Sequence, residues 1–424
     1  MPGFVRQEPG DSRLFTPAFL LLGVADLGYF VAIGIAIHGL PLYVTGPVGS
    51  DEFGAGLAFG AFGVTALVCR PFAGRLSDSR GRRPLLVVGA ALAAAGMVLL
   101  PLADSLAAVV GIRLLQGVAE AAFFVAGFAL LADLAPPARL GEALSYNSLG
   151  LYLGIALGPP LGELLIDRSG YHAAWYGATA LCLLAGLLVL AIPEPPRESD
   201  GDGHGRLIHR PGIPVSVGFF TSLAAISGFL VFASLRADEV GLSVTSRALL
   251  IYGLVVVFCR IAFARVPDRL PSLPLGSASL AAIAAGLAVV AVWGTPAGLM
   301  VGVVVMAVGV AFSTPAFFAA IFATATPSER GAAAGTASAF IDLGLGFGPI
   351  ALGLVADAKG ISWALGVAAG IAVLGAVWTL RLAMTASQAG RSSASAPRDT
   401  AHLERNVARS GRLTGRPGRG PRRR

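Results

Sequence analysis

Long apolar stretches recur along almost the whole chain, and they constrain its fold more than any other feature. A helix needs about 20 apolar residues to cross the hydrocarbon core of a bilayer. Only 13% of the 424 residues are charged, about half the share usual in a soluble protein. The sequence therefore predicts an all-α membrane protein with twelve transmembrane helices, near residues 16–43, 53–75, 84–103, 106–133, 141–166, 173–193, 213–235, 243–265, 273–293, 297–324, 332–356 and 361–383.

The placement of basic residues predicts how these helices are oriented. Cytoplasmic loops of membrane proteins are enriched in Lys and Arg. With a cytoplasmic N-terminus, the predicted outer loops hold only Arg168, Arg236, Arg247 and Lys359, and the predicted inner segments hold many more arginines. The preference for Arg over Lys, with abundant Ala and Gly, is typical of a bacterial genome rich in G and C. We expect a multi-pass protein of the bacterial inner (cell) membrane with both termini in the cytoplasm.

Two polar segments divide the chain. The segment from Glu194 to Gly212 is rich in Pro, Gly and charge, which is typical of a linker. The last 41 residues hold ten arginines against Asp399 and Glu404, and this composition predicts disorder, with contacts to anionic lipid. The predicted parts are an N-terminal six-helix bundle (1–193), a cytoplasmic linker (194–212), a C-terminal six-helix bundle (213–383) and a disordered Arg-rich cytoplasmic tail (384–424).

The two predicted bundles are related in sequence. GVTALVCRPFAGRLSD (63–78) aligns without a gap with GLVVVFCRIAFARVPD (253–268), an offset of 190 positions. The same offset relates Gly154, Gly158 and Pro159 to Gly344, Gly348 and Pro349. Repeats at one offset indicate two copies of one unit. Because each copy has six spans, both begin on the same side of the membrane, as parallel repeats do.

One strongly charged run interrupts the apolar pattern. GRLSDSRGRRPLL, from Gly74 to Leu86, resembles the loop signature between the second and third helices of major facilitator superfamily transporters. The matching residues are Gly74, Leu76, Asp78, Gly81, Arg82, Arg83 and Leu86, whereas Ser79 stands where that family usually has a basic residue. A solvated loop that only sets topology would also hold arginines, but it does not require an acid followed by Gly-Arg-Arg.

The resemblance implies the two-bundle fold of that superfamily and a gate at this loop. It implies that Asp78 accepts hydrogen bonds at the N-terminus of the eleventh span, where a helix dipole favours an anion. Asp133, at the inner end of the fourth span, is the expected partner of Arg82 or Arg80. Such contacts would favour one of two conformational states.

A second motif lies in the fourth span. RLLQGVAEAAFF begins at Arg113 and resembles the R-x-x-Q-G signature of the same superfamily. Arg113, Gln116 and Glu120 share one helix face by their spacing. A charge inside a membrane is costly, so these residues indicate a polar cavity. An Arg113–Glu120 pair that only joins helices is the alternative.

A third motif lies in the fifth span. GIALGPPLGE contains Gly154, Gly158, Pro159 and Gly162 and resembles the span-five signature of the drug:proton antiporter branch with twelve spans. Glu163 replaces that signature's final glycine. A face of small residues permits close helix packing, and we expect it to slide against a helix of the other half.

Proton coupling requires a titratable group within the membrane. Asp26, Glu120 and Asp342 lie within predicted spans. Asp26 is the first choice as proton carrier, with Arg113 as its expected partner, because the resemblance places spans 1 and 4 at the central cavity. Asp342 either contacts substrate or is a satisfied core carboxyl.

Taken together, these features predict a secondary active transporter, and proton-coupled efflux of small drug-like or metabolite molecules is the first hypothesis. Proton-coupled uptake of a metabolite or sugar is the alternative. No nucleotide-binding or hydrolase motif is present, so we expect neither an enzyme nor a cofactor. The expected partners are a small molecule, protons and the lipid bilayer, without nucleic acid, and the protein is expected to be a monomer. Aromatic residues in spans 1, 4 and 10 suit an apolar ligand of neutral or cationic character, or simply pack in the core.

Overall fold

The computed structural model describes residues 14–136, 139–194, 208–326 and 329–395. Within these ranges the ordered elements are helices, without a strand. They are α1 (Pro17–Thr45), α2 (Glu52–Arg80), α3 (Arg82–Leu99), α4 (Leu106–Leu134), α5 (Leu140–Leu190), α6 (Ile213–Glu239), α7 (Arg247–Ala262), α8 (Val266–Arg269), α9 (Ser272–Val292), α10 (Pro296–Phe322), α11 (Arg330–Lys359) and α12 (Ile361–Ser395), with short 3-10 helices at Leu100–Leu102 and Arg210–Gly212.

The expected spans are all present as helices. In the described part of the chain, ten helices are long and apolar enough to cross a membrane. One of them, α5, contains two spans, because Gly170 adopts φ 78° and ψ 176° and breaks the helix between them. The remaining span is α7, which has only 16 residues. The fold class is therefore the predicted one, an all-α membrane protein.

Several helices end a few residues away from their predicted bounds, as α2 does at Arg80 rather than near residue 75, and the bounds of α7 and α12 are informative. α7 begins at Arg247 rather than near residue 243 and ends at Ala262 rather than near 265, because polar turns flank it and Pro267 follows. α12 continues to Ser395, beyond the predicted boundary at 383, since no proline occurs before Pro397. Residues 195–207 of the predicted linker and 396–424 of the predicted tail lie outside the described residues, so that division into parts stays a prediction.

The connections between helices alternate between two ends of the bundle. We call the end with the α2–α3 connection at Gly81 the arginine face, because Arg80, Arg82 and Arg83 lie there. The end with the α1–α2 connection, residues 46–51, is the opposite face. Side chains of Thr16, Asp51, Ser105 and Thr295 cap the first turns of α1, α2, α4 and α10, so these helices start where their sequence specifies.

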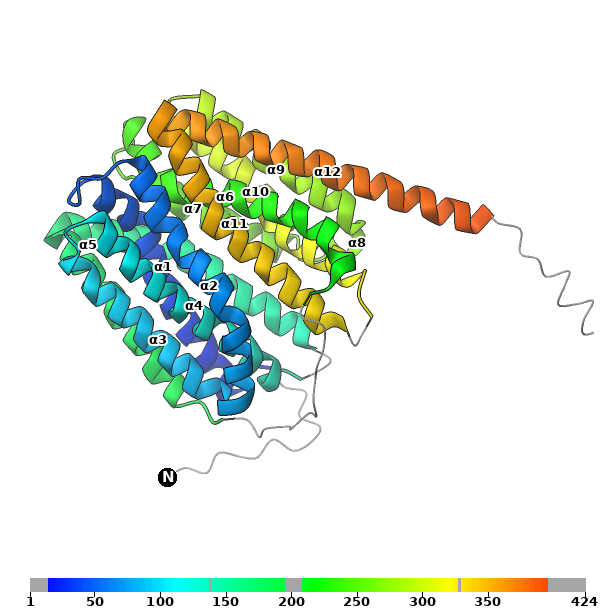
Figure 1. Cartoon of the computed structure of the whole chain (residues 1–424), viewed down its shortest axis with the longest axis horizontal. Coiled ribbons are helices and arrows are strands. Elements are labelled where there is room, and N and C mark those ends of the chain that lie inside the picture. Colours follow the sequence, from blue (N-terminus) through cyan, green and yellow to red (C-terminus); the bar gives the residue numbers. More distant parts are fainter. Residues whose placement is uncertain (1–13, 137–138, 195–207, 327–328, 396–424) are drawn as a thin grey trace, which may run out of the picture. The chain divides into compact units, whose positions relative to one another are not determined.

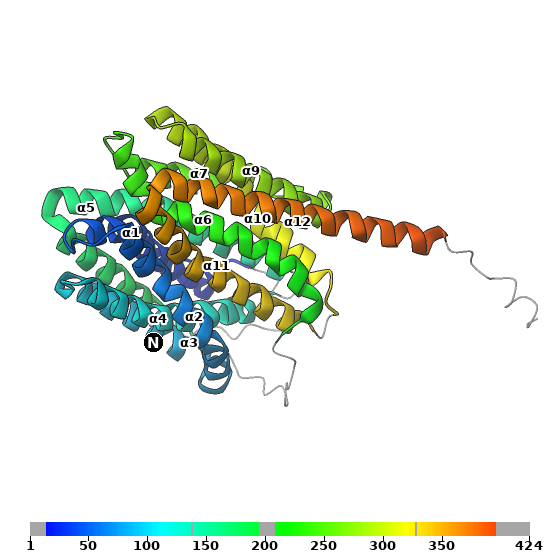
Figure 2. The same cartoon turned by 45° about the horizontal axis from the view of Figure 1, so that its top comes forward.

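Residues up to Leu380 form one compact unit, and Arg381 begins a second. Within the first unit, α2 lies beside α11 although the two are far apart in the chain (Figures 1 and 2). α1 packs along α5, and α5 also contacts α7. These neighbours bring residues of the first half against residues of the second.

The contacts between helices repeat with the offset found in the sequence. A Cβ on Gly63 of α2 would lie 2.7 Å from the backbone nitrogen of Gly346 in α11. The equivalent residue 190 positions later, Gly253 of α7, meets Ala156 of α5 in the same way, at 2.6 Å from its Cβ. Since Ala156 is itself 190 positions before Gly346, both contacts are copies of one interface. The internal repeat predicted from sequence is therefore confirmed.

The two halves approach most closely toward the opposite face. A Cβ on Gly56 would lie 2.3 Å from the carbonyl oxygen of Pro349, and a Cβ on Gly60 would lie 2.2 Å from that of Gly346. At some glycines of both ends the Cβ position meets nothing within 4 Å, as at Gly74 and Gly331 toward the arginine face and at Gly49 and Gly360 at the opposite face. Close glycine packing between the halves is therefore found toward the opposite face, and a pocket that includes Asp26 and Asn147 lies toward the arginine face.

Candidate functional site

Asp26 of α1 lies in a buried position near the arginine face. Its side chain accepts a hydrogen bond of 2.6 Å from Asn147 Nδ2 of α5, and the residue is 3% exposed. It lines a pocket together with Phe19, Gly23, Leu131, Tyr146, Asn147 and Gly150. Asn147 is neutral and no cation contacts Asp26 among the described residues, so this carboxyl has a polar partner without a counter-charge.

The expected pair between Asp26 and Arg113 does not form. Arg113 of α4 instead donates to the carbonyl oxygens of Ala58 (3.0 Å) and Phe59 (3.3 Å) in α2. It also donates to Gln116 Oε1 at 2.7 Å. The prediction was wrong because α2 supplies acceptors close to the guanidinium. The alternative Arg113–Glu120 pair is likewise replaced by these bonds, and Arg113 joins α4 to α2.

Glu120 lies one helix turn beyond Gln116 on α4. Its carboxylate accepts a hydrogen bond of 3.1 Å from the Tyr29 hydroxyl. The Tyr29 ring is stacked on Phe123, with centroids 3.8 Å apart. Three of the aromatic residues of spans 1, 4 and 10 are buried, namely Tyr29, Phe123 and Phe317. They pack in the core, which was the alternative to ligand binding.

Asp342 of α11 has a partner that the sequence reasoning did not assign. Arg70 of α2 donates from both Nε and Nη2 to the two carboxylate oxygens, the second bond being 2.8 Å. The Arg70 guanidinium also lies 4.5 Å from the centre of the Phe124 ring. A two-pronged Arg–carboxylate bond is among the stronger polar contacts in proteins. Asp342 therefore ties α11 to α2, and the recurrence of Arg70 in the repeat was the available signal for its importance.

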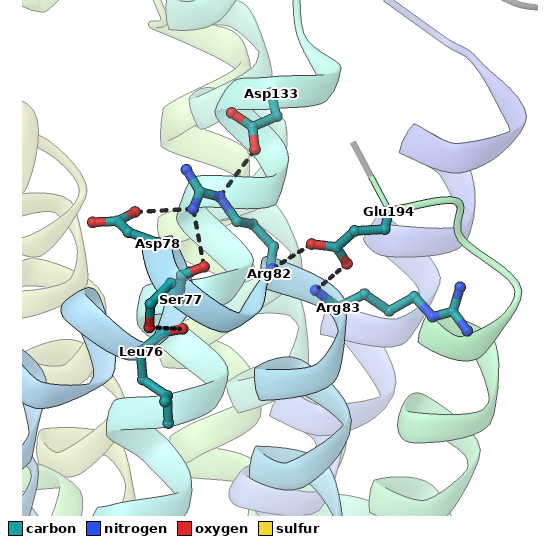
Figure 3. Close-up of polar contacts among 8 residues, drawn as sticks. Leu76, Ser77, Asp78, Arg82, Arg83, Asp133 and Glu194 are labelled. Atoms are coloured by element: carbon teal, nitrogen blue, oxygen red, sulfur yellow. Dashed lines mark hydrogen bonds and ion pairs between the residues drawn. The ribbon is translucent and has the colours of Figure 1, made fainter. Parts of the chain in front are cut away.

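The charged loop forms a network within the first half (Figure 3). Arg82 donates to Asp78 at 2.9 Å and to Asp133 at 3.1 Å, and the second contact is the one expected from sequence. Gly81 enables the turn between α2 and α3 with φ 106°, a conformation that glycine adopts readily. The loop thus places one guanidinium between two carboxylates.

Glu194 completes this network, and the sequence reasoning missed it. Its carboxylate accepts the backbone N–H groups of Arg82 (2.7 Å) and Arg83 (2.9 Å) (Figure 3). These are two of the free donors of the first turn of α3, and a carboxylate is favoured there. Predicting this contact required knowing that the chain after α5 returns to the start of α3.

The expected contact between Asp78 and the N-terminus of α11 is absent from the described contacts. Asp78 binds Arg82 within its own half, and its side chain is 75% exposed. In the first two turns of α11, the Cβ positions of Gly331 and Gly335 meet nothing within 4 Å. The contacts of Asp78, Arg82 and Asp133 are thus confined to the first half.

The span-five motif packs within its own half, contrary to expectation. A Cβ on Gly154 would lie 2.5 Å from Phe30 Cβ, and a Cβ on Gly158 would lie 2.5 Å from the carbonyl oxygen of Val31. Gly34 of α1 faces Gly158 and Pro159. The glycine face therefore seats α5 on α1, and a different face of α5, with Ala156, meets α7 of the second half.

Glu163, which replaces the motif's final glycine, reaches the second half. Its carboxylate accepts the N–H groups of Thr245 (2.7 Å) and Ser246 (3.3 Å) and both of their hydroxyls. Ser246 is the residue that precedes α7. Nearby, His38 Nδ1 of α1 lies 2.8 Å from Ser234 Oγ of α6. Polar contacts therefore close the opposite face between the two halves.

Comparisons with known proteins agree with this architecture. The family model described as Major Facilitator Superfamily matches residues 18–319 and 277–414. The uncharacterized MFS-type transporter STM4428 of Salmonella typhimurium is 30% identical over 367 residues, which is 82% of this chain and 92% of that protein. The uncharacterized MFS-type transporter YhhS of Escherichia coli is 27% identical over 369 residues, covering 83% and 89% of the two chains.

Solved structures share the fold at low sequence identity. The nucleoside transporter NupG superposes with a TM-score of 0.72 at 16% identity, covering 86% of this chain and 99% of that one. A bacterial homologue of the human lysosomal transporter Spinster, in an inward-facing and occupied conformation, has a TM-score of 0.68 at 15% identity, covering 87% and 96%. The chain belongs to the Major Facilitator Superfamily and is a multi-pass membrane transporter, not an enzyme.

Proposed function

We propose that this protein exports small organic molecules from a bacterial cell in exchange for protons. We take the arginine face as cytoplasmic, from the arginine distribution. With the opposite face closely packed and a pocket toward the arginine face, we assign the structure to an inward-facing state. The observation that carries the proposal is Asp26, a buried carboxyl with the neutral Asn147 as its hydrogen-bond partner, in a pocket toward the arginine face.

Because Asp26 is buried without a counter-charge, binding a proton would stabilise it, and it is therefore suited to proton exchange. A carboxylate removed from water is costly unless a proton, a cation or hydrogen bonds compensate it. The other two candidates have positive charges near them, since Asp342 binds Arg70, and Arg70 and Arg113 both act electrostatically on Glu120. Asp26 is therefore the group whose charge is most free to change during a transport cycle, and its protonation would compete with substrate binding.

The contacts that close the opposite face suit alternating access. They consist of close glycine packing between α2 and α11 and a few polar bonds at Glu163 and His38. In the other state these bonds would break. The Asp78–Arg82–Asp133 network would then contact α11 at the arginine face. Each state would then be held by its own polar contacts, as two-state switching requires. We propose that one monomer carries out this cycle.

Two experiments in sequence test the proposal. Expression in a pump-deficient bacterial host should raise resistance to some members of a toxic-compound panel, and a protonophore should remove that resistance. Everted vesicles would then accumulate the same compound when their lumen is acidic. An Asp26→Asn variant should lose the dependence on the pH gradient, whereas Asp104→Asn, an exposed acid between α3 and α4, should keep it. Movement of substrate in the import direction would instead support the uptake alternative, and full gradient dependence in Asp26→Asn would refute the role of Asp26.

A further inference from the structure

Arg260 of α7 has two buried donors without a partner. Its Nη1 donates to Ser148 Oγ of α5 at 3.0 Å, and its guanidinium lies 4.6 Å from the centre of the Tyr152 ring. The Nε and Nη2 atoms are buried and make no hydrogen bond. Buried polar atoms in native structures are nearly always paired, so these two donors require an explanation.

The internal repeat shows what is missing. Arg260 is the copy of Arg70 at the offset of 190 positions, and Tyr152 stands where Asp342 stands in the other copy. Arg70 binds the Asp342 carboxylate with Nε and Nη2. The same two atoms of Arg260 are the free ones, because Tyr152 offers a ring and not a carboxylate. The second copy therefore keeps the pair of donors that binds a carboxylate, Nε and Nη2 of Arg260, which we call the fork, and it lacks the carboxylate itself.

The position of this fork suits a transported molecule. It lies between α5 and the last turn of α7, toward the arginine face, at the place in the second copy that the Arg70–Asp342 pair has in the first. Ser148 accepts a hydrogen bond from Arg260, and the preceding residue, Asn147, donates one to Asp26. One turn of α5 therefore contacts both Arg260 and Asp26. An unpaired charge within a membrane protein is costly, and a bound anion would offset that cost.

We propose that Arg260 binds the carboxylate of a small organic monoanion, which is the transported substrate class. The carboxylate oxygens accept hydrogen bonds from Nε and Nη2 in the arrangement that Asp342 adopts on Arg70. This assignment rests on the proposed transport function and replaces the expectation of a neutral or cationic ligand.

Binding to the purified full-length protein in a neutral detergent tests the assignment without any proton gradient. The probes are butane, benzene and naphthalene scaffolds, each as the carboxylate, the amide and the amine. At least one carboxylate should raise the unfolding temperature and bind with a measurable Kd, at least tenfold more tightly than its amide and amine. If no scaffold shows this preference for the carboxylate, the assignment is wrong.

Variants locate the binding. Arg260→Gln should weaken carboxylate binding at least tenfold, and Arg260→Lys should be intermediate, because lysine keeps the charge but loses the fork. Tyr152→Asp supplies the missing carboxylate and should also weaken binding at least tenfold. Arg265→Gln removes an equal charge from an exposed position and should bind as the wild type does. Unchanged affinity in Arg260→Gln, or in a folded Tyr152→Asp, would contradict the assignment.

Two further experiments are needed. The first distinguishes a substrate carboxylate from a bound lipid, and the second tests carboxylate binding separately from proton coupling. If only phosphatidylglycerol stabilises the protein in an Arg260-dependent manner, the fork is a lipid contact and the substrate assignment fails. Carboxylate binding that persists in a protein without proton-coupled flux would refute the proposed coupling and leave the assignment standing. Proton-coupled flux restricted to amines and amides would refute the carboxylate assignment and leave the proposed coupling standing.

Discussion

The contact between Glu163 and the start of α7 predicts a shift between the two conformational states. Glu163→Gln keeps the shape of the side chain and removes its charge. The wild-type carboxylate accepts bonds from two backbone N–H groups and two hydroxyls at Thr245 and Ser246. The amide has only one acceptor oxygen, so it loses a backbone bond and presents a donor to the N-terminus of a helix.

The magnitude follows from these losses. A hydrogen bond to a charged group contributes about 1.5–3 kcal/mol, and a charge at a helix N-terminus adds about 0.3–1 kcal/mol. Glu163 is only partly buried, so solvent screens part of this, and we expect a cost of about 1.5–2 kcal/mol to the closed opposite face. That cost changes the ratio of the two states roughly 10- to 30-fold. A minor state at about 1% would then reach roughly 10–25%.

Distances between spin labels measure this shift. Labels at Ser169 of α5 and Asp238 of α6, both exposed at the opposite face, report on separation of the two halves, after the native cysteines are replaced. Glu163→Gln should add a longer distance population, whereas Asp167→Asn, an exposed acid one turn later, should not. Identical distance distributions for Glu163→Gln and the wild type would refute the reasoning that this contact holds the opposite face closed.

Two further predictions concern the charge pairs nearer the arginine face. Asp78→Asn breaks an exposed bond to Arg82, which contributes at most about 1 kcal/mol here. The unfolding temperature should therefore hardly change, whereas transport turnover should fall severalfold. Unchanged turnover would mean that the loop only sets the topology. Asp342→Asn leaves Arg70 unpaired at a site where Asp342 is 2% exposed, and should cost about 3–5 kcal/mol of folding free energy. Thermal unfolding should show a loss of several degrees that Arg70→Gln in the same chain partly restores, and equal stability of Asp342→Asn and the wild type would contradict it.

Much of the fold could be predicted because it depends on regularities along the chain. Span length, arginine placement and the 190-residue offset are properties of the sequence itself. The offset even predicts contacts, since Gly63 and Gly253 meet equivalent neighbours. The break at Gly170 also falls in a predicted connection. Helix bounds differed most at the end of α12, and α7 begins late because the turn before it is bonded to Glu163.

Partners across the bundle could not be predicted in the same way. Periodicity tells which residues share a helix face, but it does not tell which neighbour that face meets. Arg113 was therefore assigned to Asp26, although backbone carbonyls of α2 were nearer. The glycines of span five were assigned to the other half, although they seat α5 on α1. Glu163 looked like a departure from a motif, and its partners became visible only with the α6–α7 connection in place.

The central claim is that proton movement through Asp26 drives transport. The most direct measurement is the release of protons from acid-loaded everted vesicles when a transported substrate is added, followed with a pH-sensitive dye. The wild type should release protons in proportion to substrate uptake, and Asp26→Asn should reduce that release at least tenfold while still binding substrate. Equal substrate-dependent proton release from the wild type and from Asp26→Asn would contradict the account.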